Sequence, residues 1–245
     1  MGRADLVHFK SDDALATAVA EAWLAEIKSA HQQGRRHLVA LSGGRITRKL
    51  FGEVVRMCGA GAGTMDGVHF FWADERCLAP EDAESNYRLA RELLFEPLRI
   101  HSNQVHRIRG ELAAEEGAKQ AAAELQGIAR SEVGIMPVFD LVLLGMGEDA
   151  HVASLFPGDA TTEGDLKSVF LPVHNAPKPP PDRVSLGHGA IAAAREVWVL
   201  ASGQGKEAAL RQSLAPGGGT PLARVIQSRG QTRLFTDILL DGTPT

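Results

Sequence analysis

The stretch "FDLVLLGMGEDAHVASLFPG" (139–158) decides the fold of this chain. Its first residues, "FDLVLLG" (139–145), form a nearly continuous apolar run, which is typical of a strand buried on both faces of a parallel sheet. Glycines and charged residues follow at once, among them Glu148, Asp149 and His151. In open parallel sheets, ligands bind beyond the carboxyl ends of the strands. We therefore expect an active crevice where this run ends.

Further apolar runs recur along the chain and leave room for helices between them. They are "HLVALS" (37–42), "VHFFWAD" (68–74), "SVFLPV" (168–173), "RVSLGHGAI" (183–191) and "EVWVLAS" (196–202). Strands that alternate with helices are typical of an α/β fold. We predict an open, mostly parallel, Rossmann-like sheet with helices on both faces. Residues 1–245 are expected to form a single α/β domain, with a small subdomain after residue 150 as an open alternative.

The segments between these runs carry apolar residues at helical spacing. Helices are expected over residues 12–33, 47–58, 85–96, 112–130, 205–214 and 221–228. Ser11 or Asp12 is the expected N-cap of the first helix, because short polar side chains accept hydrogen bonds from the free N–H groups there. Two stretches rich in Pro or Gly are expected to be loops, "HNAPKPPPDR" (174–183) and "APGGGTP" (215–221).

Composition and charge limit the classes of function open to the chain. Its 245 residues have 44% hydrophobic content and a formal net charge of −4, which argues against a general nucleic-acid binder with a basic face. Cys58 and Cys77 are the only cysteines, so neither a disulfide framework nor a cysteine zinc site is expected. The N-terminal residues lack an apolar signal core, and the longest apolar runs are too short to span a membrane. These features predict a soluble cytoplasmic protein that binds neither nucleic acid nor membrane.

Two glycine-containing turns follow predicted strands. In "LSGG" (41–44), the two glycines lead from a strand toward a helix, so backbone N–H groups could approach an anion there, and Ser42 could add a hydroxyl. An ordinary strand–helix turn is the alternative.

"SGQGKEAAL" (202–210) resembles a P-loop but lacks its first Gly and its final Ser or Thr. Lys206 lies in the first helical turn, where a cation opposes the helix dipole unless it faces a bound anion. A solvated Lys206 is the alternative.

Acidic and basic side chains stand at two other strand ends. "WADER" (72–76) places Asp74 and Arg76 beyond one run, where an internal ion pair is the alternative to a role in binding. His151 follows Asp149 by two residues, and a histidine beside a carboxylate can act as a general base near neutral pH. A purely structural histidine is the alternative.

"GMGEDA" mimics a dinucleotide fingerprint, but it lies deep in the chain. No strand ending in an acid follows about 20 residues on, so no dinucleotide cofactor is expected.

Together these segments resemble the 6-phosphogluconolactonase family, within the wider group of sugar-phosphate isomerases and glucosamine-6-phosphate deaminases. The matching segments are "LSGG" (41–44), "WADER" (72–76), "ESNYRLARELLF" (84–95), "FDLVLLGMGEDAHVASLFPG" (139–158), "DRVSLGHGAI" (182–191) and "GKEAAL" (205–210). They occur in the family's order over nearly the whole chain. The "DxHxASLFPG" pattern is the most specific, because the deaminases continue with Asn-Glu-Pro after the histidine.

The resemblance implies hydrolysis of 6-phospho-D-glucono-1,5-lactone to 6-phosphogluconate in the oxidative pentose phosphate pathway, with no cofactor and no metal. His151 is then the expected base for the attacking water and the acid for the departing ring oxygen, and Asp149 would orient it. Asp74 would orient Arg76 or a sugar hydroxyl, and Arg76 and Lys206 would hold the phosphate. The full set of expected substrate-binding residues is Ser42, Gly43, Gly44, Arg45, Asp74, Arg76, Arg183 and Lys206.

Two positions depart from the family's pattern. The family has Ser-Thr-Pro where this chain has Arg45, Ile46 and Thr47, and it has Gly where this chain has Ala150. Thr47 is expected to be the N-cap of a helix over 48–58, while Arg45 either reaches the phosphate or points to solvent. Two rival functions stay open, namely a related sugar-phosphate isomerase or deaminase and a non-catalytic sugar-phosphate sensor. The chain is expected to be a monomer or a weak homodimer.

Overall fold

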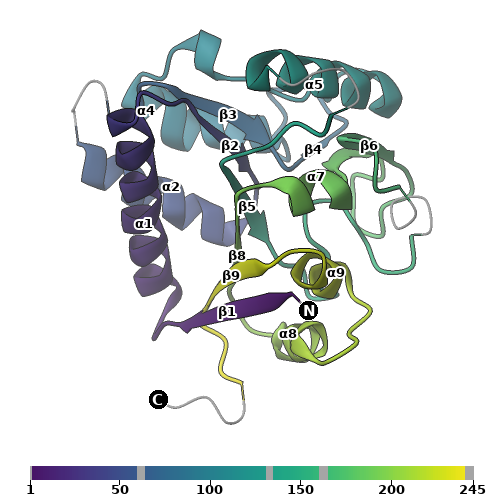
Figure 1. The fold of residues 1–245 in the computed structure, drawn as a ribbon. Helices are drawn as coiled ribbons and strands as arrows, with labels where there is room; N and C mark the ends of the chain where they lie inside the picture. Colours follow the sequence, from purple (N-terminus) through teal and green to yellow (C-terminus); the bar gives the residue numbers. More distant parts are fainter. Residues whose placement is uncertain (1, 60–63, 131–134, 160–164, 241–245) are drawn as a thin grey trace.

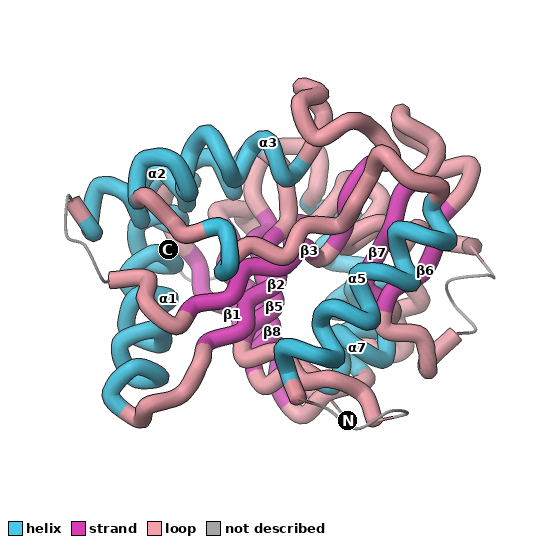
Figure 2. The backbone as a smooth tube through the Cα atoms, turned by 90° about the horizontal axis from the view of Figure 1, so that it is seen from above, coloured by secondary structure: helices cyan, strands magenta, loops and turns pink. Residues whose placement is uncertain are grey.

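The computed structural model describes residues 2–59, 64–130, 135–159 and 165–240. Its largest element is a six-stranded parallel sheet in the order β1-β9-β8-β5-β2-β3. The strands are β1 (Arg3–His8), β2 (His37–Leu41), β3 (Val68–Trp72), β5 (Leu141–Gly145), β8 (Glu196–Ala201) and β9 (Gln231–Thr236). Helices α1 and α2 lie on one side of this sheet, and α5 and α7 lie on the other (Figure 1 and Figure 2). The predicted α/β fold with a mostly parallel sheet is confirmed.

Most of the helices coincide with predicted segments, although their ends are shifted. They are α1 (Asp12–Gln32), α2 (Arg45–Cys58), α3 (Asn86–Ala90), the π-helix η1 (Arg91–Phe95), α4 (Glu96–Leu98), the 3₁₀-helix η2 (Ser102–Gln104), α5 (Ala114–Ala129), α7 (His188–Ala193), α8 (Glu207–Leu214) and α9 (Pro221–Gln227). Ser11 caps α1, because its hydroxyl accepts a hydrogen bond from the Ala14 N–H at 3.2 Å. The single helix expected over 85–96 is instead a series in which η1 joins α3 to α4.

A second, antiparallel sheet accounts for three further strands. It has the order β4-β7-β6, with β4 at Asp74–Arg76, β6 at Phe170–Val173 and β7 at Arg183–Leu186. The prediction that the runs 168–173 and 183–191 join the parallel sheet is therefore wrong. The proline-rich connection between them is too short for the crossover that parallel neighbours need, so it closes a hairpin. The end of the second run forms helix α7 instead of strand.

The two sheets meet at Ala73, between β3 and β4. Its N–H donates to the Leu41 carbonyl and its carbonyl accepts from the Leu186 N–H, both at 2.7 Å. The run 68–74, which was expected to be one strand, is thus divided between two sheets. Because β4 leaves the main sheet at this point, Asp74 and Arg76 are carried past the carboxyl end of β3.

The edge strand β1 and its neighbour β9 were not predicted. Their sequences, "RADLVH" and "QTRLFT", mix polar and apolar residues and lack the continuous apolar run of a central strand. The side chains of β1 are only partly buried, as expected at the edge of a sheet. The edge position therefore explains the weak sequence signal of β1, whereas β9 is an inner strand whose polar residues interrupt the apolar run.

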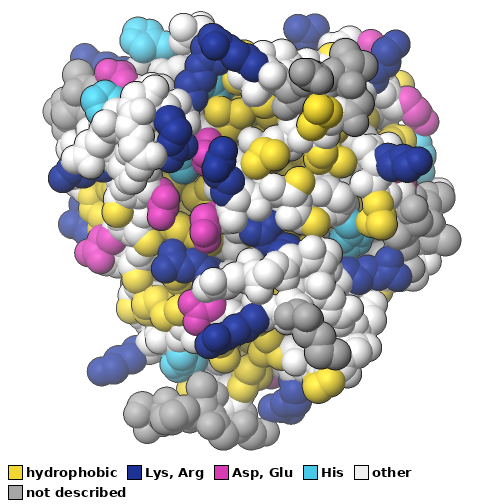
Figure 3. Space-filling view, viewed as in Figure 1, with side chains coloured by type: hydrophobic (Ala, Val, Ile, Leu, Met, Phe, Trp, Pro, Cys, Tyr) yellow, Lys and Arg dark blue, Asp and Glu magenta, His cyan; other side chains and the backbone are white. Residues whose placement is uncertain are grey.

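The interior is apolar and the surface carries mixed charge. Trp23, Trp72 and Trp198 are at most 1% exposed and belong to the core. On the face drawn in Figure 3, basic and acidic side chains are interspersed and no broad basic field covers the surface. No helix among the described residues is both long enough and apolar enough to cross a membrane.

A buried histidine should make the fold sensitive to acid. His37, at the start of β2, is 4% exposed, and its Nε2 accepts a hydrogen bond from the Trp23 indole at 3.3 Å. Burial lowers the pKa of His37 from 6.5 to about 4, so the unfolded chain takes up a proton there more readily than the folded one. The neutral ring therefore contributes stability that is complete above pH 6.5 and is lost as the pH falls toward 4.

The variant His37→Gln tests this contribution. Glutamine keeps an acceptor for the Trp23 indole but does not titrate. Each pKa unit corresponds to about 1.4 kcal/mol, so the lowered pKa of His37 accounts for a loss on the order of 3 kcal/mol in unfolding free energy between the two pKa values. We expect urea titrations at a series of pH values to show a shallower decline for the variant. Equal declines in both proteins would mean that His37 is not responsible.

Candidate active site

The site lies where the strand order of the main sheet reverses. From β2 the chain goes outward to β3, whereas from β5 it goes the other way, to β8 and β9. The loops after β2 and β5 consequently diverge at the carboxyl edge of the sheet and leave a crevice between them. Open α/β sheets commonly bind their ligands at such a point.

One cleft at this edge collects the residues singled out in the sequence. Of the ten predicted catalytic and binding residues, all except Asp149 line it, and Asp149 contacts His151 from behind. The lining consists of Ser42, Gly43, Gly44, Arg45, Ile46, Asp74, Arg76, Asn86, Gly145, Met146, Gly147, His151, Ala153, Arg183, Leu200, Ser202 and Lys206. These residues come from six separate stretches of the chain.

His151 and Asp149 form a hydrogen-bonded pair at the cleft. The imidazole Nδ1 lies 2.5 Å from Asp149 Oδ1, and its ring packs on Phe156 with centroids 4.7 Å apart. Burial raises the pKa of Asp149, but the His151 hydrogen bond and charge outweigh this effect and hold it below its usual value. An ionised carboxylate only accepts hydrogen bonds, so Nδ1 carries the proton that it shares with Asp149. That arrangement leaves Nε2 as the free base.

The loop before His151 closes tightly on itself. The Gly147 N–H donates to the His151 carbonyl at 2.9 Å, and the Ala150 N–H donates to the Gly147 carbonyl at 3.1 Å. A Cβ atom on Gly147 would lie 2.1 Å from both Nδ1 and Cε1 of His151. Only glycine therefore leaves room for the imidazole in its observed position.

Two cations stand on opposite sides of the cleft. The Lys206 ammonium, at the N-cap of α8, donates to the Met146 carbonyl at 2.6 Å. Burial, followed by the positive charge of Arg45, lowers the pKa of Lys206. Arg76 donates to the Glu84 carbonyl at 2.8 Å, and its Nε is buried without a hydrogen-bond partner in the described part of the chain. Both groups could donate hydrogen bonds to the oxygens of an anion.

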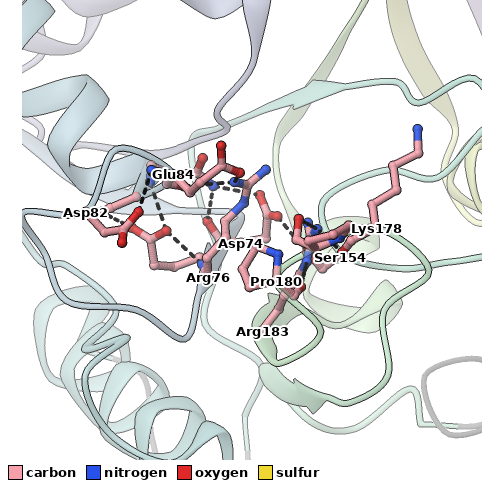
Figure 4. A network of polar contacts seen from close by, with 12 residues as sticks. Asp74, Arg76, Asp82, Glu84, Ser154, Lys178, Pro180 and Arg183 are labelled. Carbon is pink, nitrogen blue, oxygen red and sulfur yellow. Dashed lines mark hydrogen bonds and ion pairs between the residues drawn. The ribbon is translucent and has the colours of Figure 1, made fainter.

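Arg183 is held by the proline-rich loop. Its Nε donates to the Pro180 carbonyl at 3.1 Å, and its Nη2 donates to the carbonyls of Lys178 at 2.8 Å and Pro179 at 3.2 Å. Figure 4 shows the guanidinium enclosed by this loop and turned toward Ser154. Arg183 is 4% exposed, so the loop fixes it in place and supplies acceptors for its charge.

Asp74 is the buried acid of the cleft. Its Oδ2 accepts from the Ser154 hydroxyl at 2.7 Å and its Oδ1 from the Asn86 amide at 3.4 Å. The internal ion pair with Arg76, one alternative for "WADER", does not appear in the described structure, where Arg76 pairs with Glu84 at 3.4 Å. Asp74 thus joins β4 to α3 and to the loop after His151 (Figure 4).

Arg45 makes contacts that neither sequence alternative described. Its guanidinium pairs with Asp12 and donates to the Ser202 hydroxyl at 3.0 Å, at the rim of the cleft.

The prediction that Thr47 caps a helix over 48–58 is wrong, because α2 already begins at Arg45. Its N-cap is Gly44, which enters with φ 107, a conformation that favours glycine. The Thr47 hydroxyl donates to the Gly43 carbonyl at 3.0 Å within the first turn.

Comparison with known proteins identifies the family of this chain. The sequence profile of the family described as glucosamine-6-phosphate isomerases/6-phosphogluconolactonase matches residues 10–234. This chain belongs to that family. The 6-phosphogluconolactonase of Streptomyces coelicolor is 34% identical over 238 residues, which cover 93% of this chain and 89% of the relative.

Two further relatives agree with this placement. The 6-phosphogluconolactonase of Bos taurus is 36% identical over 207 residues, covering 83% of this chain and 79% of the relative. The crystal structure of 6-phosphogluconolactonase from Leishmania guyanensis superposes with a TM-score of 0.85 at 25% identity, covering 99% of this chain and all of that one.

Ala150, where the resemblance led us to expect glycine, has an unusual backbone conformation. Ala150 has φ 62, in the left-handed region that favours glycine, and its side chain is fully buried. Ala150 therefore has a backbone conformation in which glycine, the residue expected from the resemblance, would be less strained. His151 stays in the cleft despite the substitution.

Asn86 and Ser154 are two site residues that the sequence did not assign. Asn86 stood in a matching segment without a role, yet it lines the cleft and its amide donates to the Asp74 carbonyl at 2.9 Å. A Cβ on Gly43 would lie 1.9 Å from Asn86 Oδ1, so the Gly-Gly turn also admits this side chain. Ser154 is fully buried, and its hydroxyl donates a hydrogen bond to Asp74. Its position three residues after His151 was the only sequence signal.

Acidic and sulfur-bearing side chains do not gather into a metal site in the described part of the chain. No group of three or more His, Cys, Asp or Glu residues there is placed to hold a metal ion. Polar contacts in the cleft instead come from guanidinium, ammonium, imidazole, amide and carboxylate groups. Such a set suits an anionic, hydroxyl-rich ligand.

Proposed function

We propose that this chain is a cytoplasmic 6-phosphogluconolactonase, which hydrolyses 6-phospho-D-glucono-1,5-lactone to 6-phospho-D-gluconate in the oxidative pentose phosphate pathway. The observation that carries the proposal is the His151–Asp149 pair beside a cleft lined with cations. The relatives named 6-phosphogluconolactonase support the choice of substrate.

In the proposed reaction, His151 handles the proton. Its Nε2 takes a proton from water as the water oxygen bonds to the lactone carbonyl carbon. The carbonyl oxygen gains negative charge, and the tetrahedral intermediate then collapses with cleavage of the bond to the ring oxygen. His151 returns the proton to that oxygen, which becomes the C5 hydroxyl. Asp149 keeps the ring in the tautomer with Nδ1 protonated and stabilises the imidazolium between these steps.

The cations of the cleft would hold the phosphate. Lys206 and Arg76 each have their charge partly desolvated, which strengthens charge-assisted hydrogen bonds to an anion. Arg183 is fixed by the proline-rich loop. It donates to the Ser154 hydroxyl, which in turn donates to Asp74. We assign these two groups, Arg183 and Asp74, to contacts with the substrate's oxygens, and the Ser42–Gly44 turn to the wall facing them.

Alanine substitutions test the phosphate assignment. Lys206→Ala and Arg76→Ala should each lower kcat/KM for the phosphorylated lactone by about 10- to 150-fold, equivalent to roughly 1.5–3 kcal/mol for a hydrogen bond to a charged group. Steady-state assays should show a much smaller loss with glucono-1,5-lactone, which has no phosphate. A loss of equal size on both lactones would place these residues elsewhere in the reaction.

A second assay separates the proposed activity from its nearest rival. The purified protein is given either the phosphorylated lactone or glucosamine 6-phosphate, and product formation is followed in parallel. We expect turnover of the lactone only. Release of ammonia from the amino sugar at a comparable rate would assign the chain to the deaminase side of its family.

A further inference from the structure

A second groove lies on the opposite side of α3 from the active cleft. Its walls come from α3, η1 and the turn after α4, together with the segment that leads to α5. Four guanidinium groups line it, those of Arg91, Arg99, Arg107 and Arg109, beside the ring of Tyr87. We call it the arginine groove. It shares no lining residue with the active cleft.

Part of the arginine groove is already fixed by internal contacts. Arg107 forms a two-pronged pair with Glu111 at 2.6 and 2.7 Å, and its guanidinium lies 5.7 Å from the centroid of the Tyr87 ring. Arg91 pairs with Glu96 at 3.4 Å. The other carboxylate of the lining, Glu124, is 2.7 Å from His106 Nδ1. Both lining carboxylates are thus engaged.

The remaining two arginines have no such contact. The side chains of Arg99 and Arg109 are exposed, and neither has a hydrogen bond or ion pair in the described part of the chain, although Arg109 feels the charge of Glu111 at longer range. Arg99 also has φ 52, a conformation in which Gly or Asn is less strained. Positive groups that converge in a concave surface repel one another until an anion enters.

We propose that the arginine groove binds a small phosphate anion of multiple charge, of the pyrophosphate or nucleoside polyphosphate class. Arg99 and Arg109 would each donate to its oxygens, because guanidinium matches phosphate with paired N–H groups. Arg107 and Tyr87 form the fixed wall. The π-helical η1 beside them is a feature that often marks functional segments. The net charge of the chain is −4, so this positive groove is a local feature and not the result of a basic surface.

The arginine groove is connected to the active cleft through α3. Asn86 faces the cleft and the adjacent Tyr87 faces the groove. The buried carboxylate of Glu75 accepts from both of their N–H groups, at 2.9 and 2.7 Å, and from the N–H of Arg76. An anion in the groove would therefore bind against the same short helix that presents Asn86 to the substrate.

Isothermal titration calorimetry with pyrophosphate tests the proposal. Saturating 6-phosphogluconate is present to occupy the active cleft, and the salt concentration is kept low. We expect one pyrophosphate per chain for the wild type. The double variant Arg99→Ala/Arg109→Ala should bind at least about tenfold more weakly, since it loses two charge-assisted hydrogen bonds. The matched control Arg3→Ala/Arg195→Ala removes two exposed arginines elsewhere and should bind as the wild type does.

Two outcomes would overturn the proposal. One is the absence of binding to the wild type under these conditions. The other is binding that survives in Arg99→Ala/Arg109→Ala but is lost in Lys206→Ala, because the anion would then occupy the active cleft. Neither outcome depends on lactone turnover. The use of 6-phosphogluconate to fill the cleft rests on the proposed function, and the Lys206→Ala variant shows whether pyrophosphate entered the cleft instead.

Discussion

His151→Asn should lower kcat for the phosphorylated lactone by about 10²–10⁴-fold, the usual effect of losing a general acid–base group. Asparagine can still donate a hydrogen bond to Asp149, but it has no basic nitrogen to take a proton from water. The His151 side chain is 18% exposed at the edge of the cleft, so the change leaves the core intact. Initial rates with the spontaneous reaction subtracted give the ratio.

A matched variant shows whether the effect is specific. His31→Asn makes the same chemical change on an exposed residue at the end of α1 and should keep wild-type turnover. Thermal unfolding of both variants should fall close to that of the wild type. If His151→Asn retained full kcat, another group would have to be the base.

Gly147→Ala should lower kcat by about 100-fold or more, because a displacement of the catalytic group by about 1 Å costs that much in well-ordered sites. The added methyl would lie 2.1 Å from the His151 ring and 2.6 Å from Asp149 Oδ1, so one or both side chains must move. Binding of 6-phosphogluconate should change far less, since the atoms nearest to the added methyl belong to His151 and Asp149 and not to Lys206 or Arg76. Comparing kcat with the affinity for product separates the two effects.

Gly52→Ala is the control for this substitution. It makes the same change in the middle of α2, where a Cβ would meet no atom within 4 Å. Alanine is also the better helix former, so this variant should be active and at least as stable as the wild type. Normal turnover in Gly147→Ala would show that the imidazole does not need its observed position.

Much of the site could be predicted because the fold brings its parts together in a simple way. Parallel strands end at a common edge, so unusual residues after "HLVAL" and "FDLVLLG" were expected to meet, and Ser42 and His151 do line one cleft. The runs are continuous and apolar, which made the central strands clear. The position of a residue that directly follows such a run can therefore be predicted from the sequence.

Contacts that cross between distant segments could not be predicted. Ser154 and Asp74 are 80 residues apart, and the Ser154 hydroxyl comes within 2.7 Å of the Asp74 carboxylate where β4 pairs with β7. The pairing of Arg45 with Asp12 depends on how α2 packs beside α1, which a pattern of residues does not state. The runs that became β6 and β7 resembled buried parallel strands, since apolar sequence alone does not give strand direction.

The decisive measurement is the rate at which freshly prepared 6-phospho-D-glucono-1,5-lactone disappears, followed at neutral pH with the spontaneous hydrolysis subtracted. The wild-type protein should accelerate this reaction catalytically, and the acceleration should fall with His151→Asn but not with His31→Asn. A wild-type protein that bound 6-phosphogluconate without accelerating the hydrolysis would be a sugar-phosphate sensor, and that result would contradict the account.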